Sequence, residues 1–401
     1  MRPIHYLINR LLTSTLKFVQ RFLVFPSQMT FSGQGSTEQL CAHVSRLGHK
    51  KVLLITDKIL VDLGLADKVK AAIESHQGEL IIYDGVLPDP TVTMVNEGLA
   101  IVRAQGCDAI IAMGGGSSID TAKGVAAAAT HDGIESLVGI LKLKRETLPL
   151  FAIPTTSGTG SEISIAAVIS DPDTHQKGVM ADPKLIPQAV ALDANLLTGM
   201  PASVTASTGI DALSHAIETY TGRWADESVK NYSGTAVKLI FKYLPRACVD
   251  GQDLEAREAL SLASYYAGLS LNTGSVGNVH ALAHQLGSKY AIPHGVAIGA
   301  VMPPVLSLSV NKMQQPLAQL ASLIGVAKTE CSNLQNAHLF IRSLTDLQTQ
   351  VKMPEQLNKL RDEDISQLAA DGIKEALAYP VRHFLSQSEA ESLLKRLLSR
   401  A

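Results

Sequence analysis

Five short apolar segments in the first half of the chain constrain its fold more than any other feature. Each holds at least four consecutive apolar residues, whereas a strand with one solvent-exposed face would alternate apolar and polar residues. Helical stretches separate them. The pattern predicts an α/β domain with a mostly parallel sheet covered by helices on both faces. The segments are KVLLIT (51–56), ELIIYD (79–84), DAIIAM (108–113), LFAIPT (150–155) and QAVALD (188–193).

The strand signal ends at about residue 200, where long helical patterns replace it. Examples are ASTGIDALSHAIETYTG and DLEAREALSLASYYAGLSLN, in which apolar residues recur with helical spacing. A domain boundary is therefore predicted near Met200 and Pro201. The sequence divides into a basic extension (1–30), an α/β domain (31–200) and an all-α domain (201–401).

Two glycine- and hydroxyl-rich segments each follow a predicted buried strand. The first, MGGGSSIDTAKGVA (113–126), also opens a helix, so its backbone N–H groups could bind a phosphate. Its spacing is neither G-x-G-x-x-G nor the P-loop pattern. The second is PTTSGTGSE (154–162). Two such loops on one sheet predict a nucleotide site. The candidate residues are Gly114, Gly115, Gly116, Ser117, Ser118, Asp120, Thr155, Thr156, Ser157, Thr159 and Ser161.

Asp57 ends the first predicted strand, in the sequence LLITD. A carboxylate there can accept hydrogen bonds from both ribose hydroxyls of an adenosine and would repel a 2'-phosphate. An aspartate before a helix is also a common N-cap. Both interpretations stay open.

Histidines gather in two segments of the second half. STGIDALSHAIE (207–218) places Asp211 and His215 four residues apart on one helical face, and VHALAH repeats this spacing with His280 and His284. His294 follows in the same apolar region. Five such polar side chains among alanine, leucine and glycine would be costly to bury without a partner, and a divalent cation satisfies them. The pattern predicts a metal site.

One carboxylate and several imidazoles suit Fe(II) or Zn(II), while the absence of cysteine from these two segments argues against a structural zinc site. Four ligands would leave one of the five residues over. Spacing alone does not say which histidine is spared, because His280 and His284 face the same way.

The first thirty residues carry Arg2, Arg10, Lys17 and Arg21 and no acidic residue. These basic residues interrupt every apolar run well short of the roughly 18 residues that span a membrane. Three interpretations stay open: a helix docked on this protein or on a sister subunit, a helix lying on a membrane surface through residues 1–25, and an organelle transit peptide.

Composition indicates a soluble globular protein. Hydrophobic residues make up 46% of the 401 residues, charged residues 18%, and the formal net charge is −2, which does not favour nucleic acid as a partner. The four cysteines lie far apart without a C-x-x-C pair, so a reducing compartment is expected.

Together, GGGSSIDTAK, PTTSGTGSE, TGIDALSHAIE and VHALAHQLGSKYAIPHG closely resemble the iron-containing (group III) alcohol dehydrogenase family. The resemblance extends from about residue 45 to 400 and implies a Rossmann-like sheet followed by a helical domain. It assigns the metal to Asp211, His215, His280 and His294. It places His284 beside the substrate, as the catalytic proton relay.

The resemblance further implies a reversible NAD-linked oxidation of a primary alcohol or short diol to an aldehyde. Fe(II) is the expected metal, with Zn(II) as the alternative, and Asp57 with the two glycine-rich loops is expected to hold NAD rather than NADP. A homodimer or larger homo-oligomer is expected. The expected location is the cytoplasm, where the protein could also contact a membrane surface. If residues 1–30 are a transit peptide, the expected location is the mitochondrion.

Three other functions compete with this one. A hydroxyacid–oxoacid transhydrogenase would keep its cofactor bound and turn over without added NAD. A lyase of the dehydroquinate synthase type would need many basic side chains, and the segments 207–220 and 270–299 offer only Lys289. A catalytically silent, membrane-associated metal-binding protein is the third, and the intact ligand set argues against it.

Overall fold

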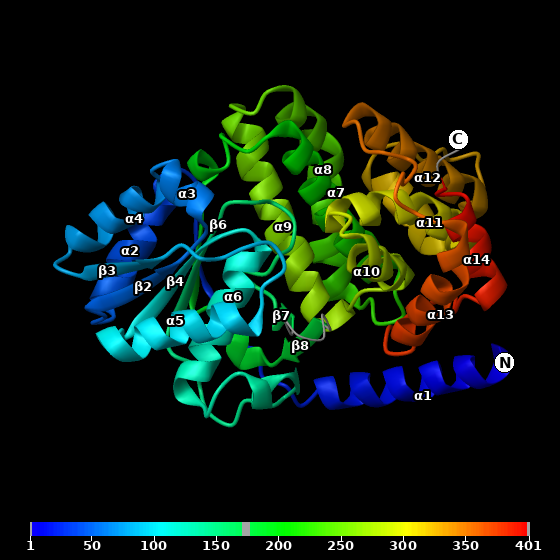
Figure 1. Cartoon of the computed structure of the whole chain (residues 1–401). Helices are drawn as coiled ribbons and strands as arrows, with labels where there is room; N and C mark the ends of the chain where they lie inside the picture. Colours follow the sequence, from blue (N-terminus) through cyan, green and yellow to red (C-terminus); the bar gives the residue numbers. More distant parts are fainter. Residues whose placement is uncertain (1, 171–176, 399–401) are drawn as a thin grey trace. The chain divides into compact units, whose positions relative to one another are not determined.

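The computed structural model describes residues 2–170 and 177–398, and side chains from His5 onward except that of Lys177. The chain forms two compact units. One comprises Val24–Gly199, and the other combines Met1–Leu23 with Met200–Ala401. The first is an α/β unit and the second is helical (Figure 1). The predicted fold class is confirmed.

A six-stranded parallel sheet forms the centre of the α/β unit, with strand order β1-β9-β6-β4-β2-β3. All five predicted strands are present within one or two residues of their predicted bounds. The sixth, β1, is a partly exposed strand at the edge and has no continuous apolar run. The strands are β1 (Met29–Ser32), β2 (Lys51–Ile55), β3 (Glu79–Tyr83), β4 (Ala109–Gly114), β6 (Leu150–Pro154) and β9 (Ala189–Leu192).

Helices cover both faces of this sheet, which explains why its central strands hold continuous apolar runs. In β2, Val52 and Leu54 pack with α2 and α4, whereas Leu53 and Ile55 pack in the opposite core with α5 and α6. Figure 1 shows these two helix pairs on opposite faces. The helices are α2 (Ser36–Arg46), α3 (Lys58–Asp62), α4 (Leu65–Glu74), α5 (Val92–Gln105) and α6 (Gly116–Thr130).

A small second sheet, which the sequence pattern did not predict, completes this unit. Its order is β5-β8-β7, with β7 and β8 antiparallel. Lys123 of α6 is fully buried beside it and donates hydrogen bonds to the carbonyl oxygens of Ser164 (2.8 Å) and Ala166 (2.7 Å). The strands are β5 (Gly139–Ile140), β7 (Ala166–Ser170) and β8 (Lys177–Ala181).

The helical unit is built around α11, its longest helix. This helix is apolar enough to cross a membrane by length and composition, but 61% of its most apolar stretch is buried in the core of the unit. It is therefore a core helix. The helices of the unit are α1 (Arg2–Gln20), α7 (Ala202–Thr221), α8 (Glu227–Val249), α9 (Leu254–Gly274), α10 (Asn278–Tyr290), α11 (His294–Leu323), α12 (Asn333–Gln350), α13 (Ile365–Ala376) and α14 (Gln387–Lys395).

The first helix docks on this unit through polar contacts. Asn9 is buried and donates to the carbonyl oxygens of Ala376 (3.1 Å), Leu377 (3.0 Å) and Tyr379 (2.9 Å). These carbonyls lie at the end of α13, where a helix leaves its last C=O groups unpaired. Asn9 therefore caps a helix more than 360 positions away in sequence.

Candidate metal centre and nucleotide site

The helix α7 carries three acidic or imidazole side chains on one face. Asp211, His215 and Glu218 are spaced by four and three residues, so they line up along the helix, and all three are buried. Small and apolar residues surround them in the core of the unit. A buried carboxylate or imidazole in such surroundings needs a charged or hydrogen-bonding partner.

The helix α10 brings His280 against this face. The rings of His280 and His215 stack with centroids 4.7 Å apart and planes 16° apart. Asp211, His215 and His280 each offer one ligand atom, and these three atoms lie within 4.8 Å of one another. The two helices thus bring together residues that lie about 70 positions apart in the sequence.

His294 reaches the same point from the first turn of α11. Its Nε2 lies 3.3 Å from Oδ1 of Asp211. The next residue explains how the helix comes so close: a Cβ atom at Gly295 would lie 2.2 Å from the carbonyl oxygen of Ser207 in α7. Only a glycine fits there, so Gly295 permits the close approach that positions His294.

Asp211 lies at the spacing of metal ligands from each of the three histidines. Oδ1 of Asp211 lies 3.8 Å from Nε2 of both His215 and His280, and 3.3 Å from Nε2 of His294. Ligand atoms about 2.1 Å from one tetrahedral ion lie about 3.4 Å from each other. Nε2 of His280 is buried without a hydrogen-bond partner among the described residues. The donor set therefore fits a divalent cation.

Glu218 supports this arrangement from behind. Its carboxylate accepts hydrogen bonds from the backbone N–H groups of Gly277 (2.9 Å) and Val279 (2.7 Å) at the start of α10, and lies 2.6 Å from Nδ1 of His280. A carboxylate on the far ring nitrogen fixes the orientation of a metal-binding histidine. Glu218 was not among the predicted site residues, although its spacing from Asp211 and His215 was a usable signal.

The charges at this centre favour ligand chemistry. Burial, with repulsion from the neighbouring imidazoles, holds the pKa of His280 well below its ordinary value, so its ring is neutral with a lone pair available. Burial alone would raise the pKa of Asp211, but the imidazoles of His215 and His294 outweigh it and lower that pKa. Burial raises the pKa of Glu218 to about 7 against the stabilising N–H groups of α10.

His284 lies beside this centre and points to a different partner. Its Nδ1 is 2.6 Å from Oε1 of Glu375 in α13, and the same oxygen accepts a hydrogen bond from the Tyr379 hydroxyl (2.7 Å). Gln285 donates to the other carboxylate oxygen (2.7 Å). His284 is 36% exposed, which leaves it accessible to a small molecule. No local pattern in the sequence marked Glu375.

In the α/β unit, the first glycine-rich loop leads into the N-terminus of α6 as predicted. Gly115 is the N-cap residue, and no side chain caps the helix there. The first-turn N–H groups and the helix dipole are thus directed at this end of α6, where an anion is stabilised. Gly114 has φ +148, which explains the glycine at the strand-to-helix turn.

The second loop lies directly against the first. A Cβ atom at Gly115 would lie 3.3 Å from Cγ2 of Thr156, and one at Gly116 would lie 2.8 Å from Cγ2 of Thr159. The hydroxyl of Ser157 is buried and has no hydrogen-bond partner among the residues that the structure describes. The two loops therefore form one surface that combines helix N–H groups with hydroxyl groups, as a phosphate site requires.

Other predicted members of this site contact protein groups. Asp120 accepts hydrogen bonds from the Ser161 hydroxyl and from the N–H of Val168 (2.9 Å), which ties α6 to the second loop and to β7. Thr155 donates its N–H to the carbonyl of Gly114 (2.9 Å). Ser117 and Ser118 lie in the first turn of α6. Asp120 and Ser161 thus hold the two loops together.

Asp57 serves as the N-cap of α3. Its Oδ1 accepts a hydrogen bond from the N–H of Leu60 (3.1 Å) at the carboxyl end of β2. Helix capping therefore accounts for one of the two carboxylate oxygens of Asp57. The ribose interpretation concerns the same carboxylate and stays a prediction.

Residues 26–194 match the family profile described as "Iron-containing alcohol dehydrogenase", and residues 205–398 match "Fe-containing alcohol dehydrogenase family, C-terminal". The chain is 33% identical to the NAD-dependent methanol dehydrogenase of Bacillus methanolicus, covering 91% of this chain and 97% of that one. It is 36% identical to the lactaldehyde reductase of Escherichia coli K12, covering 86% and 91%. A crystal structure of a 1,3-propanediol oxidoreductase superposes with a TM-score of 0.90 at 33% identity, covering 94% of this chain and 100% of that one.

Proposed function

Since this chain belongs to the iron-containing alcohol dehydrogenase family, we propose that its substrate is a short primary alcohol or diol. The protein is an NAD-dependent alcohol dehydrogenase that uses iron. It converts an alcohol and NAD⁺ to an aldehyde, NADH and a proton. Similar proteins are named for methanol, lactaldehyde and 1,3-propanediol, and these names support a substrate of one to three carbons.

The observation that carries the proposal is the convergence of Asp211, His215, His280 and His294. These four residues would hold the iron, and Glu218 would orient His280 through its Nδ1. When bound, the metal supplies a Lewis acid that lowers the pKa of an alcohol hydroxyl. The apolar core around α7 and α10 restricts water.

His284 would take the hydroxyl proton and pass it toward solvent. Its side chain is 36% exposed and Glu375 holds its Nδ1, so its Nε2 is the atom available to a substrate proton. The N-terminus of α6 and the second glycine-rich loop would hold the phosphates of the dinucleotide. Asp57 would accept hydrogen bonds from its ribose.

The test is a substrate panel. Protein purified without oxygen and loaded with Fe(II) is assayed for NADH formation with primary alcohols and diols of two to eight carbons, together with methanol. We expect the highest kcat/KM at three carbons or fewer. A maximum at six or more carbons would contradict the short-substrate proposal, and turnover between a hydroxyacid and an oxoacid without added NAD would favour the transhydrogenase. Metal analysis of the protein as purified, before it is loaded with Fe(II), tests iron against zinc.

For location, we propose the cytoplasm, with a contact to the membrane surface through residues 1–25. The exposed apolar side chains of α1 support this contact. The buried contacts of Asn9 support a helix that is retained, because cleavage of a transit peptide would remove them. N-terminal sequencing of the mature protein tests this, since loss of residues 1–30 would contradict it. The homodimer stays a prediction, which sedimentation velocity can test.

A further inference from the structure

The docked helix α1 leaves its apolar face in solvent. Leu7, Leu11 and Phe18 are 68%, 70% and 58% exposed, and their spacing of four and seven residues aligns them in one stripe. Phe22, in the turn that follows the helix, is 72% exposed. An amphipathic helix that packs on its own domain normally buries such a stripe. In α1, the face opposite the stripe is docked instead, through polar groups such as Asn9.

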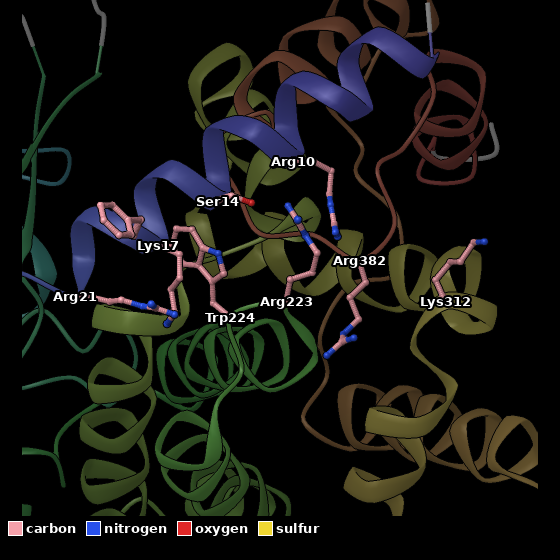
Figure 2. A pocket seen from close by; sticks show the side chains of 9 residues that line it. Arg10, Ser14, Lys17, Arg21, Arg223, Trp224, Lys312 and Arg382 are labelled. Carbon is pink, nitrogen blue, oxygen red and sulfur yellow. The ribbon is translucent and has the colours of Figure 1, made fainter.

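Beneath one flank of α1 lies a strongly basic pocket of about 680 Å³, a volume typical of small-molecule sites. Figure 2 shows Arg10, Lys17 and Arg21 on the side of α1 that faces Arg223 and Trp224. Among the residues that the structure describes, six basic side chains and no acidic side chain line the pocket. They are Arg10, Lys17, Arg21, Arg223, Lys312 and Arg382.

Little protein charge compensates these cations. Lys17 lies 3.9 Å from the half-exposed carboxylate of Asp226. Within the described part of the chain, Arg10, Arg21, Lys312 and Arg382 form no salt bridge. Burial, together with repulsion from Arg10 and Arg382, lowers the pKa of Arg223. An anion in the pocket would relieve this repulsion.

We propose that this pocket binds the phosphate groups of anionic phospholipids while the apolar stripe of α1 enters the bilayer surface. The inference rests on the membrane contact proposed above and names the residues and the lipid class. Helices that lie in a membrane interface combine an apolar face with a basic flank in this way. Anionic head groups provide the opposite charge at the depth of that flank.

The charge distribution favours a bilayer over a second copy of the chain as the occupant of this surface. Two copies meeting through α1 would bring two uncompensated basic flanks together, and their repulsion would oppose the contact. A free phosphate ion would satisfy the pocket but would leave Leu7, Leu11 and Phe22 in water. A surface of anionic lipid satisfies both features at once.

The sole tryptophan of the chain provides a direct readout, because Trp224 lines this pocket. The full-length protein is titrated with phosphatidylglycerol vesicles and with phosphatidylcholine vesicles while Trp224 emission is recorded, and binding is checked by flotation. We expect an emission change and flotation with phosphatidylglycerol. Phosphatidylcholine vesicles should bind at least tenfold more weakly.

Two double variants separate the pocket from the stripe. Arg10→Gln with Arg21→Gln should weaken phosphatidylglycerol binding about 25-fold, because each basic residue near an anionic surface contributes about fivefold. The matched control, Lys68→Gln with Arg103→Gln, changes exposed basic residues of the other unit and should not alter binding. Leu7→Ser with Leu11→Ser should weaken binding to every vesicle, whereas Ile59→Ser, at an exposed position of α3, should not.

The remaining outcomes overturn the proposal in distinguishable ways. If the arginine variant keeps full affinity while the leucine variant loses it, the membrane contact stands and the head-group site is wrong. If the unaltered protein binds neither kind of vesicle, both the proposed membrane contact and the proposed head-group site are wrong. If Trp224 responds to inorganic phosphate but not to vesicles, the pocket takes a free anion and the lipid assignment is wrong.

Discussion

Oε1 of Glu375 lies 2.6 Å from Nδ1 of His284, across 91 positions of sequence. The histidine that the family resemblance leaves outside the metal site is thus held by its own carboxylate. His280 has an equivalent partner in Glu218, also at 2.6 Å. The two histidines of one helix therefore belong to separate networks, and changes to each should have separate effects.

His280→Ala and His284→Ala should differ in metal content. His280→Ala removes one of four ligands and should lose most of the bound iron. His284→Ala should keep nearly full occupancy, while kcat falls by roughly 10²-fold, the range of a lost general acid–base group. Elemental analysis of both anaerobically purified variants checks this. A metal-free His284→Ala beside a loaded His280→Ala would reverse the ligand assignment.

Glu375→Gln should lower kcat about tenfold, because a neutral amide orients and supports His284 less well than a carboxylate. Its iron content should match that of the unaltered enzyme, since Glu375 contacts no predicted ligand among the described residues. Tyr379→Phe is the matched control: it removes a hydrogen bond to the same oxygen but keeps the carboxylate, and should lower kcat less. Equal kcat values for Glu375→Gln and the unaltered enzyme would show that Glu375 does not position His284.

Gly295→Ala should disrupt the metal centre from outside its ligand set. The added Cβ would meet the Ser207 carbonyl at 2.2 Å, so α11 must move away and carry His294 with it. We expect iron affinity to fall at least tenfold, as measured by competition with a chelator. Gly287→Ala is the control, because its Cβ would have ordinary contact at 3.6 Å and alanine favours a helix. Equal iron affinities for the two variants would contradict the role of Gly295.

Asp57 can be tested with two substitutions that separate its two roles. Asp57→Asn keeps an N-cap for α3 but removes the charge, whereas Asp57→Ala removes both and should also cost about 1 kcal/mol of stability. If the carboxylate binds ribose, both variants should lower kcat/KM for NAD by roughly 10- to 100-fold and raise it for NADP. A changed melting temperature with an unchanged NAD/NADP ratio would leave Asp57 with helix capping alone.

Lys123→Met should destabilise the α/β unit by about 2–4 kcal/mol. Lys123 is fully buried, and its loss leaves the carbonyls of Ser164 and Ala166 without their donor. Urea unfolding followed by far-ultraviolet circular dichroism should show the transition of this unit at lower urea, while fluorescence of Trp224 in the helical unit should not shift. Lys68→Met, at an exposed site of α4, is the control. An unchanged circular dichroism curve for Lys123→Met would contradict the prediction.

The strands that are buried on both faces were the elements best predicted from the sequence. Strands such as β2 and β4 hold continuous apolar runs because helices cover both faces of the sheet. Such a run can be recognised without knowing which strands pair or which turns connect them. The edge strand β1 is exposed and carries no such signal. The strands β7 and β8 of the small second sheet were also missed.

The candidate metal centre was predictable for a different reason. Helical spacing pairs Asp211 with His215 and His280 with His284, but spacing cannot distinguish two histidines on one face. That distinction depends on Glu218 and Glu375, whose contacts are set by the packing of α7, α10 and α13. The orientation of α1 was also unpredictable, because its docking face is defined by Asn9 and Thr13. These polar residues form hydrogen bonds with the rest of the helical unit rather than packing in an apolar core.

The long separation between Asn9 and its acceptors affects the order in which this protein can be completed. Ribosomes add about 5–20 residues per second, so α1 emerges roughly 20 to 70 seconds before residues 376–379 exist. The α/β unit, which is continuous in sequence, can close during that interval. The helical unit cannot, because its first helix has nowhere to dock until α13 has been made. One of the first helices to be synthesised is therefore among the last to find its native position.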